Sequence, residues 1–275
     1  IYNINRGLSM QNYLDLLKKV LEEGEETLDR TGVGTKRIFA PQLKFKFNGN
    51  KIPIITTKKV FMKGVIVELL WFLQGSTNIK YLLENNVHIW DEWADDMGEL
   101  GPVYGKQWRA WETKEGNKID QISNIINSLR NNPTSRRIIL NAWNVGEIDK
   151  MHLPPCHMMC QFSVNSRGGI ITHLYQRSAD LFLGVPFNIS SYAILTRLLA
   201  MHSGLYPSEL IMTFGDAHIY NNHIEQVKTQ LTREPYPQEA ELFINEAPNI
   251  FSHVYEDFKL ENYKFYPAIK GEVAV

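Results

Sequence analysis

The chain has 275 residues, of which 44% are hydrophobic, and a formal net charge of −1 at pH 7. This length and composition are typical of a globular protein with one large domain or two small ones. A charge so close to zero excludes a chain-wide attraction to nucleic acid or to an anionic membrane, so any anion must bind at a local cluster of arginines.

The chain has two cysteines, Cys156 and Cys160. Two cysteines are too few for a disulfide framework. They also lack the second pair of ligands that a zinc site requires. We therefore expect no metal and a reducing, cytoplasmic location. Residues 1–9 contain no continuous apolar run of the kind found in a secretory signal. We expect them to be an N-terminal extension or an upstream remnant. With no repeat or linker, residues 10–275 are expected to form a single catalytic domain.

The first elements follow from hydrophobic periodicity. Apolar residues at helical spacing predict a helix that begins at Met10 and ends at Gly24. Residues 35–47 alternate as in a strand, and Asn48-Gly49 predicts a hairpin turn after it. The next expected elements are helices at 65–74, at 78–84 with Ser76 or Thr77 as its cap, and at 119–130.

The second half of the chain mixes strands and helices without regular alternation. The expected elements are strands at 137–143, 157–164 and 170–176, a long buried helix at 189–202, a strand at 210–214, a helix at 221–231 and a strand at 240–244. This pattern predicts an α+β fold, with a large mixed β-sheet covered by helices, and not a doubly wound fold.

One cysteine stands on a di-proline corner in Leu153-Pro154-Pro155-Cys156-His157. A thiol becomes a nucleophile as its thiolate, which nearby positive groups stabilise. Arg136-Arg137 upstream and Gln176-Arg177-Ser178 downstream could bring guanidinium groups to Cys156 and depress its pKa. Buried cysteines are more often inert, so the rest of the chain must decide between the two interpretations.

Four arginines stand at points where the chain turns: Arg30, Arg136, Arg137 and Arg177. Guanidinium groups bind phosphate with paired hydrogen bonds, although surface ion pairs are the common alternative. Glu68 interrupts an apolar run, where burial would raise its pKa into an acid–base range, unless it is a partnered structural residue.

Three further segments suggest a flat heterocycle and a sugar as ligands. The aromatic residues in Trp90–Trp93 and Gly101–Gly105 could stack on a ring or simply pack in the core. Asn188 can donate and accept side by side, which matches the edge of uracil, or it could cap the following helix. The polar groups of 215–220 suit a sugar hydroxyl or an ordinary turn.

Taken together and in this order, these features resemble the thymidylate synthase family, from Asp29-Arg30-Thr31-Gly32 to Val273-Ala274-Val275. The most specific segments are 90–108, 155–157, 175–180 and 187–189. The resemblance implies methylation of dUMP to dTMP, with 5,10-methylenetetrahydrofolate giving both the one-carbon unit and the hydride and leaving as dihydrofolate. It also implies a homodimer formed through one face of the sheet.

The resemblance assigns a role to each site residue. Cys156 would be the nucleophile at carbon 6 of uracil, supported by the catalytic residues Glu68, Tyr104, His157, Asp180 and Asn188. The nucleotide would bind to Arg30, Gln176, Arg177, Ser178, Asn188, His218 and Tyr220, and to Arg136 and Arg137 of a second subunit. The folate would contact Ile89, Trp90, Trp93, Asp180, Leu183, Gly184, Phe187 and Ala274.

Three other functions stay open from the sequence. A dUMP hydroxymethylase of the same superfamily would use the same nucleophile but trap the intermediate with water. An RNA-binding regulator would need a basic stripe, which the near-neutral charge disfavours as a main role. A Cys-His hydrolase is disfavoured because adjacent Cys156 and His157 are poorly placed to form a nucleophile–base pair.

Overall fold

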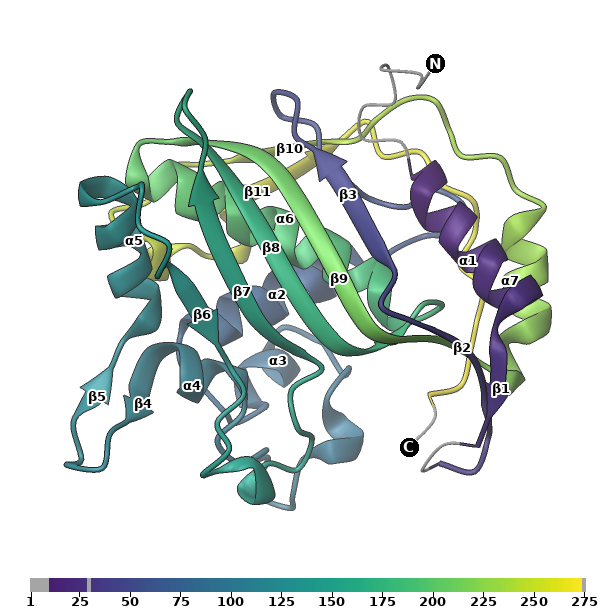
Figure 1. Cartoon of the computed structure of the whole chain (residues 1–275), viewed down its shortest axis with the longest axis horizontal. Coiled ribbons are helices and arrows are strands. Elements are labelled where there is room, and N and C mark those ends of the chain that lie inside the picture. Colours follow the sequence, from purple (N-terminus) through teal and green to yellow (C-terminus); the bar gives the residue numbers. More distant parts are fainter. Residues whose placement is uncertain (1–9, 29–30, 274–275) are drawn as a thin grey trace.

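The computed structural model describes residues 10–28 and 31–273, and a seven-stranded mixed sheet lies at its centre (Figure 1). The strand order is β1 (Glu25–Thr27), β2 (Thr35–Phe39), β9 (Tyr206–Tyr220), β8 (Gly169–Asp180), β7 (His157–Val164) and β6 (Ile139–Asn141), with β3 (Gln42–Lys46) also paired to β9. β8 and β9 run parallel, whereas the other pairs in this sheet are antiparallel.

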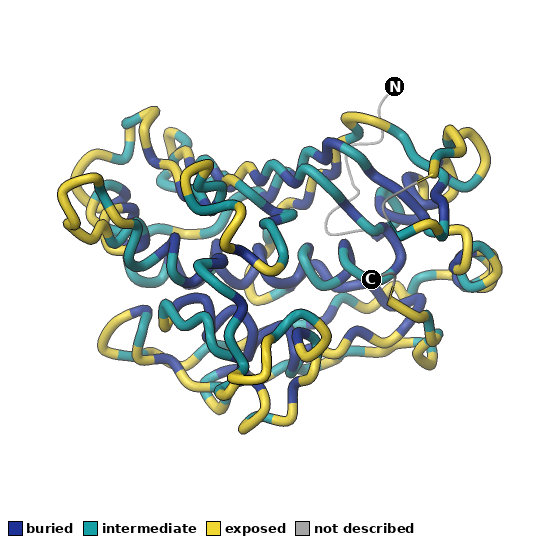
Figure 2. Tube along the Cα trace, turned by 90° about the horizontal axis from the view of Figure 1, so that it is seen from below, coloured by how far each residue is buried: buried dark blue, intermediate teal, exposed yellow. Residues whose placement is uncertain are grey.

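Two apolar helices cover one face of this sheet. α6 (Gly184–Ser203) packs on β8, β9 and α2 (Met62–Leu73), and nearly every side chain of α2 is buried. Figure 2 shows that buried residues lie towards the centre of the chain trace and exposed loops around its rim. A helix that is apolar on all sides belongs in a core, and α2 therefore places Glu68 in the interior.

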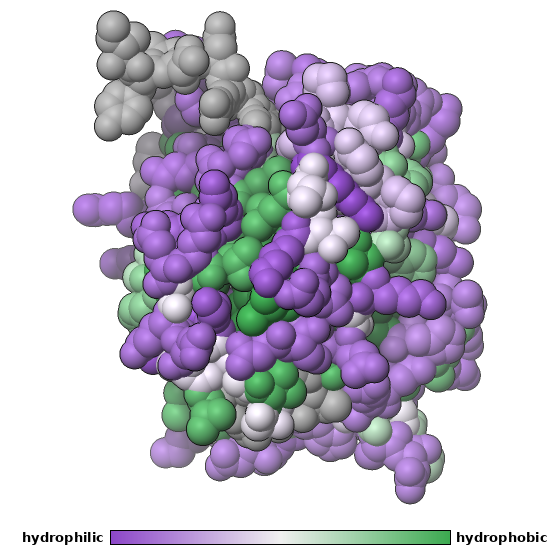
Figure 3. Space-filling view, turned by 90° about the vertical axis from the view of Figure 1, so that its right-hand side faces the viewer, coloured by the Kyte–Doolittle hydropathy of each residue, from purple (hydrophilic) through white to green (hydrophobic). Residues whose placement is uncertain are grey.

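Smaller elements surround this core. α1 (Gln11–Glu23) packs against α7 (Ile224–Leu231), and its buried side chains include Tyr13, Leu17 and Val20. Seen from that side, the surface is mostly hydrophilic, with apolar side chains gathered at its centre (Figure 3). The other elements are α3 (Lys80–Glu84), α4 (Tyr104–Ala110), α5 (Gln121–Asn131), the pair β4 (Trp111–Glu112) and β5 (Lys118–Ile119), and the pair β10 (Glu241–Ile244) and β11 (Phe258–Glu261).

The predicted α+β class and the large mixed sheet are confirmed, with seven α-helices in the described residues. Within the same residues, no helix combines the length and the apolar character needed to cross a membrane. Residues 1–9, predicted as an extension, lie outside the described part of the chain.

The single strand predicted over residues 35–47 is wrong. Ala40 adopts a φ of 61°, which an extended strand does not allow, so the chain divides into β2 and β3. Both strands still pair with β9, one after the other. The turn at Asn48 forms, because Lys51 N donates to Asn48 O at 3.1 Å, but Lys51 then bridges Glu241 and no hairpin results.

Other predicted bounds also change. α6 begins five residues before the predicted start, because Pro186 is tolerated in the first turn of a helix. β9 continues to Tyr220, so residues 215–220 lie inside a strand and not in a turn. Neither Ser76 nor Thr77 caps α3; instead Asn78 Oδ1 accepts from Lys80 N at 2.9 Å. The strand predicted at 137–143 is shorter, as β6.

Candidate active site

Cys156 lies directly before β7, and Arg177 of the neighbouring strand β8 holds this corner. Arg177 Nε donates to Pro155 O and its Nη2 to Pro154 O, each at 2.9 Å. Its backbone N donates to Cys156 O at 2.8 Å. The main-chain carbonyls thus fix a guanidinium whose Nη2 lies 4.0 Å from Cys156 Sγ.

The thiol of Cys156 is nevertheless not acidified in this chain. Burial raises its pKa, Arg177 lowers it and Asp180 raises it, and the result lies above the ordinary value for cysteine. Arg177 thus shifts the pKa of Cys156 in the predicted direction, although the thiol as a whole is not acidified. Burial outweighs the guanidinium that reaches the sulfur.

Tyr104 and His157 form a stacked pair beside Cys156. Cys156 N donates to Tyr104 Oη at 2.9 Å, and the two rings stack with centroids 4.3 Å apart. His157 Nδ1 lies 2.6 Å from Tyr192 Oη. Burial lowers the pKa of His157 to about 3, so this ring is neutral at pH 7. A neutral ring whose Nδ1 is bonded to Tyr192 is a poor base for Cys156, which disfavours the hydrolase interpretation further.

Glu68 is buried on α2 and bonded to one of the predicted aromatic residues. Trp90 Nε1 donates to Glu68 Oε1 at 2.7 Å. Burial raises the pKa of Glu68 to about 7, and the bond from Trp90 partly opposes this rise. The Trp90 ring also packs edge-on against Tyr104, with centroids 6.1 Å apart. Glu68 is thereby connected to the corner that holds Cys156.

Asn188 lies within α6 and contacts the end of β8. Gln176 Nε2 donates to Asn188 Oδ1 at 3.0 Å and to Ser178 O at 3.1 Å. Because α6 begins at Gly184, Asn188 is not the cap of this helix. Gln176 Oε1 is buried and has no hydrogen-bond partner among the described residues, so it can accept a bond from a ligand.

Asp180 orders the turn from β8 into α6. Its Oδ1 accepts from Phe182 N at 2.9 Å and Leu183 N at 3.2 Å. Partly buried apolar and aromatic side chains lie near this turn and around Trp90: Ile89, Trp93, Leu183 and Phe187. Gly184 opens α6 beside them.

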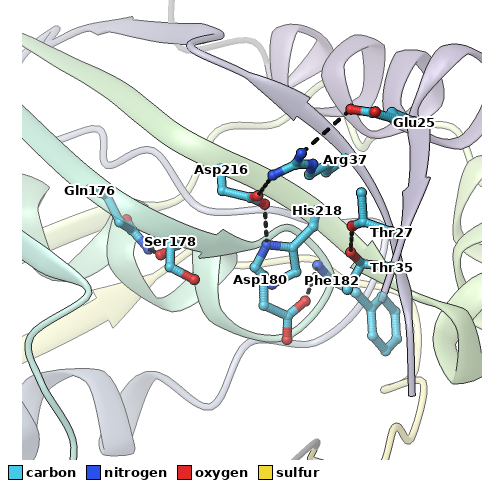
Figure 4. A network of polar contacts seen from close by, with 10 residues as sticks. All are labelled: Glu25, Thr27, Thr35, Arg37, Gln176, Ser178, Asp180, Phe182, Asp216 and His218. Atoms are coloured by element: carbon cyan, nitrogen blue, oxygen red, sulfur yellow. Dashed lines mark hydrogen bonds and ion pairs between the residues drawn. The ribbon is translucent and has the colours of Figure 1, made fainter. Parts of the chain in front are cut away.

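His218 completes the site at the far end of β9 (Figure 4). In the parallel pairing with β8, His218 lies opposite Asp180. Its Nδ1 lies 2.9 Å from Asp216 Oδ1. The ring of Tyr220 stands nearly perpendicular to the imidazole, with centroids 5.0 Å apart.

Some predicted residues lie elsewhere. Arg136 and Arg137 are exposed in the segment before β6, and they are not among the groups that act on Cys156. Arg30 and Ala274 lie outside the described residues.

Two residues near the site were not predicted. Tyr192, the partner of His157, lies in the long helix that was predicted as buried core, so nothing distinguished its hydroxyl. Lys58 is buried with Nζ 3.6 Å from the centre of the Phe182 ring, and it donates to Phe182 O. Burial lowers the pKa of Lys58 to about 8. The signal available for it was a lysine shortly after the apolar run 52–55.

The site residues form one continuous set of contacts. Nowhere in residues 10–28 and 31–273 do three or more His, Cys, Asp or Glu side chains gather so as to hold a metal ion. Contacts run from Asn188 through Gln176 and Arg177 to Cys156, and from there through Tyr104 and Trp90 to Glu68. The arrangement joins a thiol, a buried carboxyl group and a side-chain amide.

Comparison with known proteins agrees with this arrangement. The family model described as thymidylate synthase matches residues 11–275. The chain is also 90% identical, over 266 residues, to thymidylate synthase of Brachyspira hyodysenteriae (strain ATCC 49526 / WA1). The aligned region covers 97% of this chain and all of that protein. The chain therefore belongs to the thymidylate synthase family.

Proposed function

We propose that this chain methylates dUMP to dTMP with 5,10-methylenetetrahydrofolate as the donor. Membership of the family supports the reaction. The observation that carries it is the line of contacts from Cys156 through Tyr104 and Trp90 to Glu68. This line joins a nucleophile to a carboxyl group whose pKa lies near 7.

In the proposed reaction, the Cys156 thiolate adds to carbon 6 of uracil. The new S–C bond moves the electrons of the C5–C6 double bond towards C5 and the C4 carbonyl, which makes C5 nucleophilic. C5 would then bond to the one-carbon unit of the donor. Loss of the C5 proton would release the folate, the hydride would complete the methyl group, and departure of the Cys156 sulfur would restore the C5–C6 double bond. The nearby Arg177 favours the thiolate form that this step requires.

The nucleotide would bind along the ends of β8 and β9. Arg177 and Ser178, with Arg30, would hold the phosphate, and Gln176 would contact the nucleotide beside Asn188. Asn188 would read the uracil edge, and its bond from Gln176 fixes the amide for that purpose. His218 and Tyr220 would contact the sugar.

Proton transfers would centre on Glu68. A carboxyl group with a pKa of about 7 can both give and take a proton at neutral pH. Tyr104, hydrogen-bonded to Cys156 N, would assist removal of the C5 proton. His157 would act as a neutral part of the network and not as a cationic acid.

The donor fits the aromatic and apolar surface near Asp180. Ile89, Trp93, Leu183 and Phe187 offer partly buried faces for a flat pterin, and the buried Trp90 packs with Trp93. Asp180, Gly184 and Ala274 would also contact the donor. Methylenetetrahydrofolate supplies the one-carbon unit and the hydride and leaves as dihydrofolate. The proposed reaction involves no metal.

We also propose that the chain acts as a homodimer in the cytoplasm. In the described residues, helices cover one face of β7–β9 (Figure 1). The other face carries partly exposed apolar side chains, among them Met159, Ile171 and Tyr175. A second copy on this face would bury them and bring Arg136 and Arg137 to the neighbouring site. RNA binding would be secondary.

The test is the mass of the nucleotide formed from dUMP and methylenetetrahydrofolate. A methyl group added to uracil, with dihydrofolate released, supports the proposal. A hydroxymethyl group with tetrahydrofolate released would instead favour the hydroxymethylase. Absence of any product from the dimer would refute both and favour the RNA-binding role.

A further inference from the structure

Two strands place a carboxylate and a guanidinium behind the imidazole of His218. Asp216 lies two residues before His218 on β9, and Arg37 pairs with His218 across β2 and β9. His218 Nδ1 lies 2.9 Å from Asp216 Oδ1, and Arg37 Nη1 donates to Asp216 Oδ2 at 3.0 Å. Figure 4 shows the three side chains in a row. Each oxygen of Asp216 therefore has its own partner.

These contacts determine which nitrogen of His218 carries the proton. A carboxylate only accepts hydrogen bonds, so Nδ1 must be the protonated nitrogen, and Nε2 is the acceptor of the neutral ring. Burial raises the pKa of Asp216, but the hydrogen bonds from His218 and Arg37 outweigh it and hold the pKa below its ordinary value. Asp216 is thus ionised at neutral pH and acts as a constant acceptor.

The row of Arg37, Asp216 and His218 ends, at His218, where the sugar of a nucleotide would lie. In the pairing of β8 with β9, Asp216 lies opposite Ser178 and His218 opposite Asp180. The side chain of His218 is only 8% exposed, which limits how far the ring can turn. The deoxyribose of a 5′-monophosphate has a single free hydroxyl, at the 3′ position, and this hydroxyl can donate to Nε2.

We propose that Asp216, held by Arg37, is a positioning residue that keeps His218 Nε2 as the acceptor for the 3′-hydroxyl of the nucleotide. This inference rests on the proposed function, because it takes dUMP as the ligand. It adds a source of selectivity, since a nucleotide without the 3′-hydroxyl leaves Nε2 without its donor.

Arg37 makes the proposal sharply testable. A guanidinium only donates hydrogen bonds. In the Asp216→Asn variant, Arg37 therefore attracts the amide oxygen, and the amide NH₂ turns towards His218. Nδ1 must then accept, and Nε2 carries the proton, which inverts the tautomer. Replacing Arg37 as well, in Arg37→Ala/Asp216→Asn, frees the amide to rotate and restores the original tautomer.

Two measurements follow on the full-length protein. The first is the tautomer of His218 from two-dimensional proton–nitrogen NMR of ¹⁵N-histidine-labelled protein, which needs no activity. The second is kcat/KM for dUMP and for 2′,3′-dideoxyuridine monophosphate, which lacks the hydroxyl. Thermal unfolding shows that each variant is folded. Glu25→Gln is the control, because Glu25 lies 3.5 Å from Arg37 and does not contact Asp216.

We expect a proton on Nδ1 in the unmodified chain and on Nε2 in Asp216→Asn. Because the 3′-hydroxyl must then accept from Nε2 and send its own proton elsewhere, that variant should lose about tenfold in kcat/KM for dUMP and little for the dideoxy nucleotide. The double variant should recover part of the loss. Equal losses for both nucleotides, or a proton on Nε2 in the unmodified chain, would overturn the proposal. Failure of the unmodified chain to convert dUMP would instead refute the proposed function, and the tautomer result would still decide the role of Asp216.

Discussion

The buried ring of His157 makes the free energy of unfolding depend on pH. Its pKa is about 3 in the folded chain and 6.5 for an ordinary histidine, so the unfolded chain binds this proton more readily. The contribution to stability is fully present above pH 6.5 and is lost as the pH falls towards 3. Lowering the pH from 7 to 5 should therefore remove about 2 kcal/mol through this one residue.

The His157→Gln variant removes the titrating ring. It should be less stable than the unmodified chain at pH 7, because stacking on Tyr104 is lost. Between pH 7 and 5, however, it should lose about 2 kcal/mol less. Urea unfolding at one protein concentration measures both changes, and His88→Gln, which alters an exposed ring, controls for the substitution. An equal pH dependence in His157→Gln and the unmodified chain would refute the conclusion that His157 is buried as a neutral ring.

Three substitutions test the proposed site directly. Cys156→Ala should abolish turnover but retain dUMP binding by calorimetry; turnover without the thiol would exclude the covalent step. Asn188→Asp should raise kcat/KM for dCMP relative to dUMP, and unchanged selectivity would mean that uracil is read elsewhere. Trp90→Phe removes the N–H that lowers the pKa of Glu68. The pH profile of kcat/KM should therefore move to higher pH, whereas a fixed profile would assign its titration to another group.

Local signals in the sequence predicted some elements well. The bounds of α1 and α5 agree within two residues, because each has one apolar face, and Asp120 caps α5 by accepting from Ser123 N at 3.0 Å. The interruption at Ala40 had a local signal that the prediction overlooked, because Pro41 lacks the N–H that a central strand donates. The full length of β9 had none, and there Gly215 leaves room for the neighbouring strand: a Cβ at this position would lie 2.7 Å from Arg177 O.

The candidate site, too, could be predicted only in part from the sequence. The residue types that carry chemistry, such as Cys156 and Glu68, stand in recognisable motifs and could be named from the sequence. The protonation states and orientations of the site side chains depend on partners that are far away in the sequence. Tyr192 is 35 positions from His157, and Arg37 is 179 positions from Asp216. Only the fold brings such pairs together, so the neutral state of His157 and the fixed tautomer of His218 could not be predicted.

The thiol of Cys156 should respond in opposite directions to changes in its two charged neighbours. Burial raises its pKa, Arg177 lowers it and Asp180 raises it. Arg177→Gln should therefore raise the pKa of Cys156, whereas Asp180→Asn should lower it and still leave an oxygen to accept from Phe182 N. The rate of alkylation by iodoacetamide against pH reports this pKa, since only the thiolate reacts. Shifts in the same direction in both variants would mean that altered burial, and not charge, controls the nucleophile.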